Sequence, residues 1–268
     1  MPDTNAQNEH YLLERAPLVL RARGFRLYGD GGVRLVDLWQ NNGAAVLGHR
    51  PPSLLRELKN TAGRGLYAPF PHFMEGRLKN ALGGLFPGRV FRFYCGAPFV
   101  LQALVKTGEA ALWRPFSDAK SPFAVAEDAP GVLIPVLPGI QGWRGGLPLG
   151  FCALALRPEA ADGLPPGEFL PPLSLAAAAR GARELLASGK RAKPGYRRIE
   201  RALQKSPWSR RGIYLGLKEP LCRPRWEALF ARFLQAGFLL PPVPSDPLIL
   251  PGELSDGEEA ALAKLLQS

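Results

Sequence analysis

The chain has 268 residues, of which 46% are hydrophobic, so a fibrous or disordered protein is excluded and one or two folded domains are expected. Its apolar runs are too short to cross a bilayer and its polar N-terminus lacks a secretory pattern, so we expect a cytoplasmic protein without membrane insertion. Its three cysteines and three histidines have no spacing typical of a metal site, so we expect reduced thiols and no metal.

The net charge of +11 is unusual and suggests a polyanionic partner as one possibility. From Arg180 to Arg211 there are eleven Lys or Arg against two Glu, a net charge of +9. The candidate contacts to a polyanion within this segment are Arg191, Lys193, Arg197, Arg198 and Arg201. A solvated helix face followed by a linker would explain the same charge without any partner. No aromatic RNA-binding motif or zinc finger accompanies it, so sequence-specific reading of nucleic acid has no support.

The first predicted element is a β-hairpin over residues 23–38, because apolar residues alternate on both sides of Asp30-Gly31-Gly32. Further along, the leucines after Ser53 have helical spacing and predict a helix that opens there. His49 lies between these two elements, and we interpret it as a turn residue.

A strand is predicted for residues 89–94, and the apolar periodicity of residues 99–112 predicts a helix after it. The turn between them contains Cys95, Gly96 and Ala97. A strand, a glycine turn and a helix together form a geometry that can bind phosphate. An ordinary strand-to-helix connection has the same pattern, and we favour that interpretation.

The remaining elements follow from short local signals. Residues 132–137 and 151–156 are predicted strands, which we expect to pair with each other and with residues 91–94. A proline pair at 171–172 opens an alanine-rich helix, and residues 212–217 alternate as a strand. The last two helices are predicted from Trp226 to a stop at Gly237, and from a capping box that begins at Ser255.

The order of these elements resembles the class III, fold-type I pyridoxal-phosphate aminotransferases, the group of ornithine aminotransferase and glutamate-1-semialdehyde aminomutase. The resemblance depends on the hairpin that ends in Asp37, on Leu-Gly-His at 47–49, and on residues 140–150, which are similar to the family's Lys-x-x-x-Gly-Gly-x-Pro-x-Gly. It covers roughly residues 15–268, with a large deletion near 120–135. It implies an α/β protein with a reduced fold-type I large domain at 46–190. An α+β small domain would be built from residues 1–45 and 191–268.

The resemblance implies transamination or aminomutation with pyridoxal phosphate, but the residues for that chemistry are changed. Gln141 stands at the position of the Schiff-base lysine, and no lysine occurs between Ser121 and Gly189. An amide nitrogen is neither basic nor nucleophilic, so it cannot replace the amine. The family's phosphate-binding positions correspond to Cys95, Gly96, Ala97 and Gly167, where the glycine is kept and the hydroxyls are lost. We therefore expect vestigial cofactor positions, no catalytic residue and no cofactor.

Three functions remain open from the sequence. The favoured one is a pseudoenzyme with a scaffold, binding or regulatory role, with an unknown protein partner as one possibility. The resemblance implies that it is a homodimer. The second is an active transaminase or aminomutase with a rebuilt site. The third is binding of RNA or another polyanion through residues 180–211.

Overall fold

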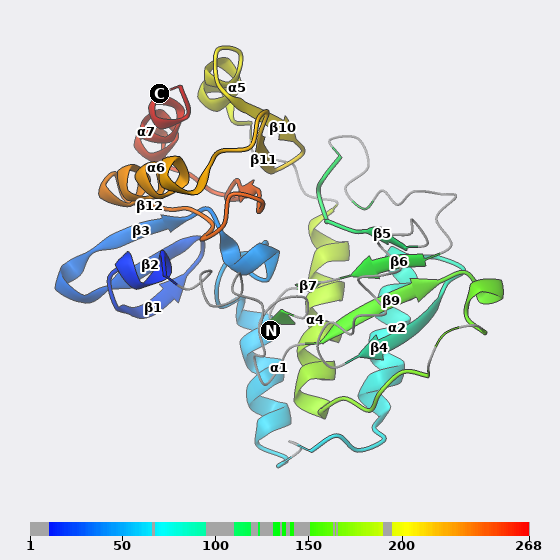
Figure 1. The fold of residues 1–268 in the computed structure, drawn as a ribbon. Coiled ribbons are helices and arrows are strands. Elements are labelled where there is room, and N and C mark those ends of the chain that lie inside the picture. The colour runs from blue at the N-terminus through cyan, green and yellow to red at the C-terminus, as the bar shows by residue number, and fades with distance from the viewer. Residues whose placement is uncertain are drawn as a thin grey trace, which may run out of the picture. The chain divides into compact units, whose positions relative to one another are not determined.

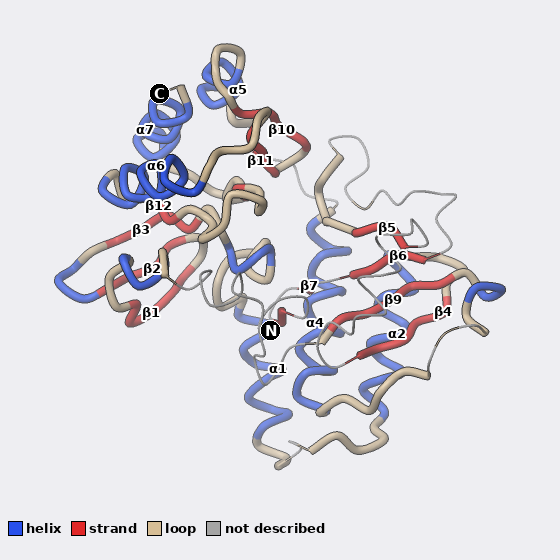
Figure 2. Tube along the Cα trace, in the orientation of Figure 1, coloured by secondary structure: helices blue, strands red, loops and turns tan. Residues whose placement is uncertain are grey.

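A computed structural model describes residues 11–65, 68–94, 110–118, 123, 131–134, 136–137, 140–141, 151–162, 164, 166–189 and 195–267. The chain divides into two compact units. The terminal unit combines Met1–His49 with Ala192–Ser268, and the central unit comprises Arg50–Arg191. Figures 1 and 2 show helices and strands in both units, so the predicted α/β class is confirmed.

The terminal unit contains a four-stranded sheet in the order β1-β2-β3-β12. The strands are β1 (Val19–Arg23), β2 (Arg26–Gly29), β3 (Arg34–Asp37) and β12 (Phe238–Leu239). The first three form an antiparallel meander, and β12 pairs parallel to β3. The predicted hairpin is confirmed: β2 and β3 are joined by the 3-10 turn η3 (Asp30–Gly32), where Gly31 and Gly32 have φ of 60° and 77°. Glycine adopts this left-handed backbone at no steric cost.

A second sheet of the terminal unit has the order β10-β11-β13 and is antiparallel throughout. Its strands are β10 (Trp208–Arg211), β11 (Tyr214–Leu217) and β13 (Leu248–Ile249). The strand predicted for residues 212–217 begins only at Tyr214, because Gly212, with φ of 61°, lies in the turn between β10 and β11.

Three α-helices and two short 3-10 helices complete the described part of the terminal unit. They are α5 (Arg197–Leu203), α6 (Arg223–Gln235), α7 (Asp256–Leu266), η2 (Leu13–Arg15) and η4 (Gln40–Gly43). Helix α6 carries Trp226, Phe230 and Phe233 into the core, where they pack with residues of the strands and of α7. The predicted end of α6 is confirmed, because Gly237 follows it with φ of 86°.

The central unit contains a sheet in the order β4-β9-β6-β5. Its strands are β4 (Val90–Tyr94), β5 (Ala110–Leu112), β6 (Gly131–Ile134) and β9 (Cys152–Leu156), and a separate ladder joins β7 (Val136–Leu137) to β8 (Ile140–Gln141). Strand β9 lies between β4 and β6 and is antiparallel to both, so the expected pairing of β9 is confirmed. Direct pairing of β6 with β4 does not occur, because β9 lies between them.

The helix predicted for residues 99–112 is wrong at its end. Residues 110–112 form β5, which pairs parallel to β6 with Ala111 opposite Val132. Ala and Leu favour helices, so the backbone hydrogen bonds to a distant strand override the local preference of these three residues. Residues 99–109 lie outside the described part of the chain.

The helices of the central unit are α1 (Pro52–Ala62), α2 (Phe73–Leu85) and α4 (Pro172–Ser188), with the 3-10 helix η5 (Pro158–Ala160). Helix α4 contacts both α1 and α2, and Figure 1 shows α2 passing behind the sheet. The predicted alanine-rich helix is confirmed, with Ala176–Ala179 all buried. Small side chains let helices approach: a Cβ added at Gly84 of α2 would lie 2.9 Å from Leu186 Cδ1 of α4. None of the described helices is long and apolar enough to span a membrane.

Candidate functional site

Gln141, which the sequence resemblance aligns with the family's lysine, is the last residue of β8 and is paired with Val136 of β7. No lysine lies within 121–189 to supply an amine in its place. Elsewhere in the described part of the central unit, Lys59 is exposed on α1 and Lys79 is exposed on α2, where it pairs with Glu75 at 2.6 Å. Neither has the desolvated surroundings that activate a Schiff-base lysine.

Gly167 lies against the free edge of β4. The neighbouring Glu168 N–H donates to the carbonyl oxygen of Phe93 at 2.8 Å, which holds this segment against the strand. A Cβ at Gly167 would lie 3.1 Å from the nitrogen of Phe93 and 3.2 Å from its carbonyl oxygen. These are backbone atoms, so a side chain at 167 requires the strand or the segment to shift.

The residues at these two positions do not fit pyridoxal phosphate. The amine is missing at Gln141, and a side chain at Gly167, the position that resembles the family's threonine, would fit only after a small shift of the backbone. Cys95, Gly96 and Ala97 lie outside the described residues, so their assignment as vestigial phosphate positions stays a prediction. No group of three or more His, Cys, Asp or Glu side chains in the described ranges is placed to hold a metal ion.

Asp37 and His49 form a polar cluster in the terminal unit. Asp37 is 2% exposed, and its Oδ1 accepts hydrogen bonds from the backbone N–H groups of Trp39 and Gln40 at 2.9 and 2.8 Å. Its Oδ2 lies 2.8 Å from Nε2 of His49. The pair therefore connects the end of β3 to the segment after Gly48, which is the anchoring role expected of a turn residue.

The turn next to this pair is strained. Gln40, Asn41 and Asn42 have consecutive φ values of 49°, 48° and 57°, a left-handed conformation that side chains disfavour. Gln40 is fully buried and its Nε2 donates to the carbonyl oxygen of Ile249 at 3.0 Å. The Asp37 hydrogen bonds and this contact hold the turn, so we assign the cluster a structural role. The Asn-Asn-Gly sequence was the signal available for it, since these residue types tolerate left-handed backbone.

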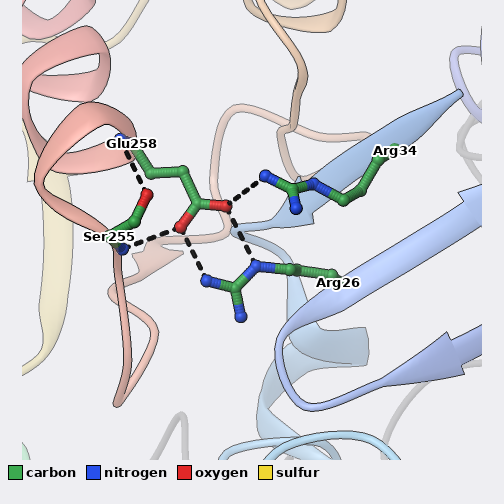
Figure 3. Close-up of polar contacts among 4 residues, drawn as sticks. All are labelled: Arg26, Arg34, Ser255 and Glu258. Atoms are coloured by element: carbon green, nitrogen blue, oxygen red, sulfur yellow. Dashed lines mark hydrogen bonds and ion pairs between the residues drawn. The ribbon is translucent and has the colours of Figure 1, made fainter.

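The charged cluster around Glu258 is also structural (Figure 3). Arg26 donates from Nε and Nη2 to the two oxygens of Glu258 at 2.9 and 2.6 Å, and Arg34 donates at 3.1 Å. Glu258 also completes the predicted capping box of α7, since it accepts from the N–H of Ser255 while Ser255 Oγ accepts from the N–H of Glu258. Burial alone would raise the pKa of the Glu258 carboxyl, but the hydrogen bonds from Arg26 and Ser255 outweigh it and lower the pKa to about 2.

The five cations predicted to contact a polyanion are only partly brought together. Arg197, Arg198 and Arg201 lie on α5 and are exposed. Arg191 and Lys193 lie outside the described residues.

The structure is similar to solved class III aminotransferases. It matches ornithine δ-aminotransferase of Plasmodium falciparum with a TM-score of 0.65 and 13% identity, over 94% of this chain and 92% of that one. It matches an omega-transaminase of Sphaerobacter thermophilus with a TM-score of 0.64 and 13% identity, over 99% and 97% of the two chains. Acetylornithine aminotransferase of Elizabethkingia anophelis has a TM-score of 0.64 and 12% identity, over 97% and 98%.

Relatives in sequence carry no stated activity. An uncharacterized protein of Treponema pallidum is 26% identical over 90% of this chain and 91% of its own length. An uncharacterized protein of Borreliella burgdorferi is 37% identical over 31% of each chain. No family model matches the chain. The chain therefore has the fold of class III aminotransferases, as the sequence predicted, with little identity to the enzymes of that fold.

Proposed function

We propose that this chain is a class III aminotransferase-like pseudoenzyme, which keeps the fold as a binding scaffold and has lost Schiff-base chemistry. The observation that carries the proposal is Gln141 at the position aligned with the family's lysine. No lysine occurs between residues 121 and 189. The amine is the nucleophile and the proton carrier of a transaminase, and an amide can perform neither step.

The packing at Gly167 supports the proposal independently. A threonine at this position would place its Cβ 3.1 Å from the backbone nitrogen of Phe93, so restoring the family's residue requires a shift of the backbone. Loss of one contact could be compensated by a neighbouring group. Loss of the amine together with tight packing at Gly167 supports the proposal that the chemistry was abandoned while the frame was kept.

The proposal is tested by turnover of amino donors. The purified full chain is incubated with pyridoxal phosphate, a panel of amino acids and ω-amines, and an oxo-acid acceptor, and the new amine is measured by chromatography. We expect no product above that formed with free pyridoxal phosphate. Gln141→Lys, with Gln141→Met as the matched control without an amine, is expected to stay inactive because Gly167 and the hydroxyl-free positions are unchanged. Catalytic turnover by the natural chain would overturn the proposal in favour of a rebuilt active site.

We further propose that the scaffold is a homodimer. The support is the resemblance to the class III aminotransferases, whose active sites form across a two-fold interface. Sedimentation equilibrium of the full chain should give twice the mass of the 29.1 kDa chain. A single species at the monomer mass across micromolar concentrations would contradict the dimer and leave the loss of chemistry untouched.

A further inference from the structure

We infer that an exposed basic surface on α5 and the turn that follows it binds the phosphodiester backbone of a nucleic-acid duplex. The surface, called here the α5 basic surface, consists of Arg197, Arg198, Arg201 and Lys205. The inference goes beyond the proposed function and does not depend on the state of the cofactor positions.

The helical repeat places two of these cations on one face of the helix. Ile199 and Ala202 of α5 are buried in the core of the terminal unit, which leaves the opposite side of the helix to solvent. Arg197, Arg201 and Lys205 recur every four residues and are all exposed, with Lys205 in the turn that follows the helix. Four residues of helix rise about 6 Å, so Arg197 and Arg201 lie about 6 Å apart along one face of α5. Lys205 follows them in a turn in which its N–H donates to the carbonyl oxygen of Ala202 at 3.3 Å.

The helix that carries these cations is firmly held. The Tyr196 hydroxyl donates to the carbonyl oxygen of Pro251 at 2.6 Å, and burial raises the pKa of Tyr196 to about 12, so the donor stays protonated. The N–H of Arg198 donates to Oε1 of Glu259 on α7 at 2.8 Å. A rigid carrier reduces the entropy lost when several cations engage one ligand at once.

The four cations of the α5 basic surface differ from the structural arginines of the same unit. Arg210 pairs with Glu200 at 2.7 Å, and Arg26 and Arg34 both pair with Glu258. Among the described residues, no ion pair or hydrogen bond involves a side chain of these four cations. The nearby carboxylates Glu200 and Glu259 are already used, by Arg210 and by the Arg198 backbone. The cations are therefore free to contact an external anion.

The surroundings favour a phosphate backbone over other polyanions. None of the large exposed hydrophobic side chains found in the described chain lies between residues 195 and 218, so this surface has no element that would enter a lipid bilayer. Tyr196 and Trp208 are buried, so no aromatic side chain is available there for stacking on unpaired bases. Exposed arginines without exposed aromatic neighbours are suited to contact the phosphates of a duplex. Such contacts depend on charge and do not read the base sequence.

The test is fluorescence anisotropy of the full chain with labelled 20-base-pair RNA and DNA duplexes between 50 and 200 mM salt. Four phosphate contacts predict a slope of log K against log salt near −3.6, which is roughly a 100-fold loss of affinity over this range. Binding to either duplex with such a slope supports the inference. The duplex that binds with higher affinity, RNA or DNA, identifies the class of the natural ligand. Absent or salt-insensitive binding overturns it, as does tighter binding to anionic phosphatidylserine vesicles or to single strands than to duplexes.

Matched variants locate the binding on the α5 basic surface. Arg197→Gln with Arg201→Gln should weaken duplex binding about tenfold and reduce the salt slope by about 2. Arg23→Gln with Arg225→Gln removes the same charge from exposed positions of β1 and α6 and should change affinity less than about threefold. Arg197→Lys with Arg201→Lys keeps the charge and should keep the slope. Equal loss in the first two double variants would show that net charge alone is responsible and would overturn the inference. Circular dichroism confirms that each variant is folded.

Discussion

In the terminal unit, charged side chains from distant parts of the chain meet in hydrogen-bonded clusters, whereas the central unit depends on small side chains that bring its helices close together. Arg26 and Glu258 are 232 residues apart and share two hydrogen bonds. In the central unit, Ala176–Ala179 of α4 are buried, and Gly84 of α2 leaves room for Leu186. Neither set of contacts includes Gln141 or Gly167, so the packing of both units does not depend on the residues at these two positions.

The largest expected effect is in the aromatic core of the terminal unit. Phe230→Ala empties a fully buried site on α6 and should lower the free energy of unfolding by about 3–5 kcal/mol. Phe169→Ala removes the same ring from an exposed position of the central unit and should change it by less than about 0.5 kcal/mol. Urea unfolding followed by tryptophan fluorescence measures both. A loss below about 1 kcal/mol for Phe230→Ala would show that α6 is not packed as described.

The central unit should respond most to added volume. Ala178→Leu inserts three carbons where α4 is fully buried and should cost about 1–3 kcal/mol. Ala187→Leu adds the same atoms to an exposed position of the same helix and should be nearly neutral. Thermal unfolding by circular dichroism compares the two. Equal melting temperatures would refute the tight packing of α4.

The terminal unit should also respond to loss of one charge. Glu258→Gln removes the carboxylate that accepts from Arg26 and Arg34 and should cost about 2 kcal/mol at pH 7, in the range of hydrogen bonds to charged groups. Glu219→Gln changes an exposed carboxylate in the same unit and serves as the control. If both variants unfold at the same urea concentration, the cluster contributes no stability.

We also expect the stability difference between the natural chain and Glu258→Gln to depend on pH. The pKa of Glu258 is about 2 in the folded chain, below its ordinary value of 4.5. Its stabilising contribution is therefore complete above pH 4.5 and is lost as the pH falls from 4.5 toward 2. The difference in unfolding free energy between the natural chain and Glu258→Gln should be constant from pH 7 to 5 and shrink by pH 3. A difference that stays unchanged at pH 3 would contradict the low pKa.

The smallest expected effect compares two glycines of the central unit. Gly167→Ala brings a Cβ within 3.1 Å of the β4 backbone and should cost about 1 kcal/mol. Gly76→Ala adds a methyl group to α2 with nothing within 4 Å and should stabilise by about 0.5–1 kcal/mol through helix propensity. Opposite signs in thermal unfolding support the close approach at Gly167. A stabilising Gly167→Ala would show that a side chain fits at position 167, and it would remove the packing argument from the proposed loss of chemistry.

Local signals in the sequence predicted much of the fold. The Asp-Gly-Gly turn, the proline pair before α4 and the capping box of α7 each act within a few residues, and each predicted its element. Residues 110–112 and the two-residue strands β12 and β13 could not be found this way, because their partners are far away in the chain.

Some residues of the candidate site could also be identified from the sequence, whereas their contacts could not. Gln141 was identified by its alignment with a family motif, and Gly167 by its place before the alanine-rich helix. The closure of Gly167 onto Phe93 needs the strand as well as the glycine, and nothing in the sequence near 167 indicates it. The clusters around Asp37 and Glu258 also combine residues from distant elements, so only the structure reveals them.

The proposed loss of Schiff-base chemistry is tested most directly by titrating the full chain with pyridoxal phosphate. The titration is followed by absorbance, and any adduct is trapped by borohydride reduction and located by peptide mapping. We expect no imine absorbance above that of surface lysines and no stoichiometric adduct on any single lysine. A one-to-one adduct on one lysine outside residues 121–189 would contradict the proposed loss, because the active site would then have been rebuilt around another amine.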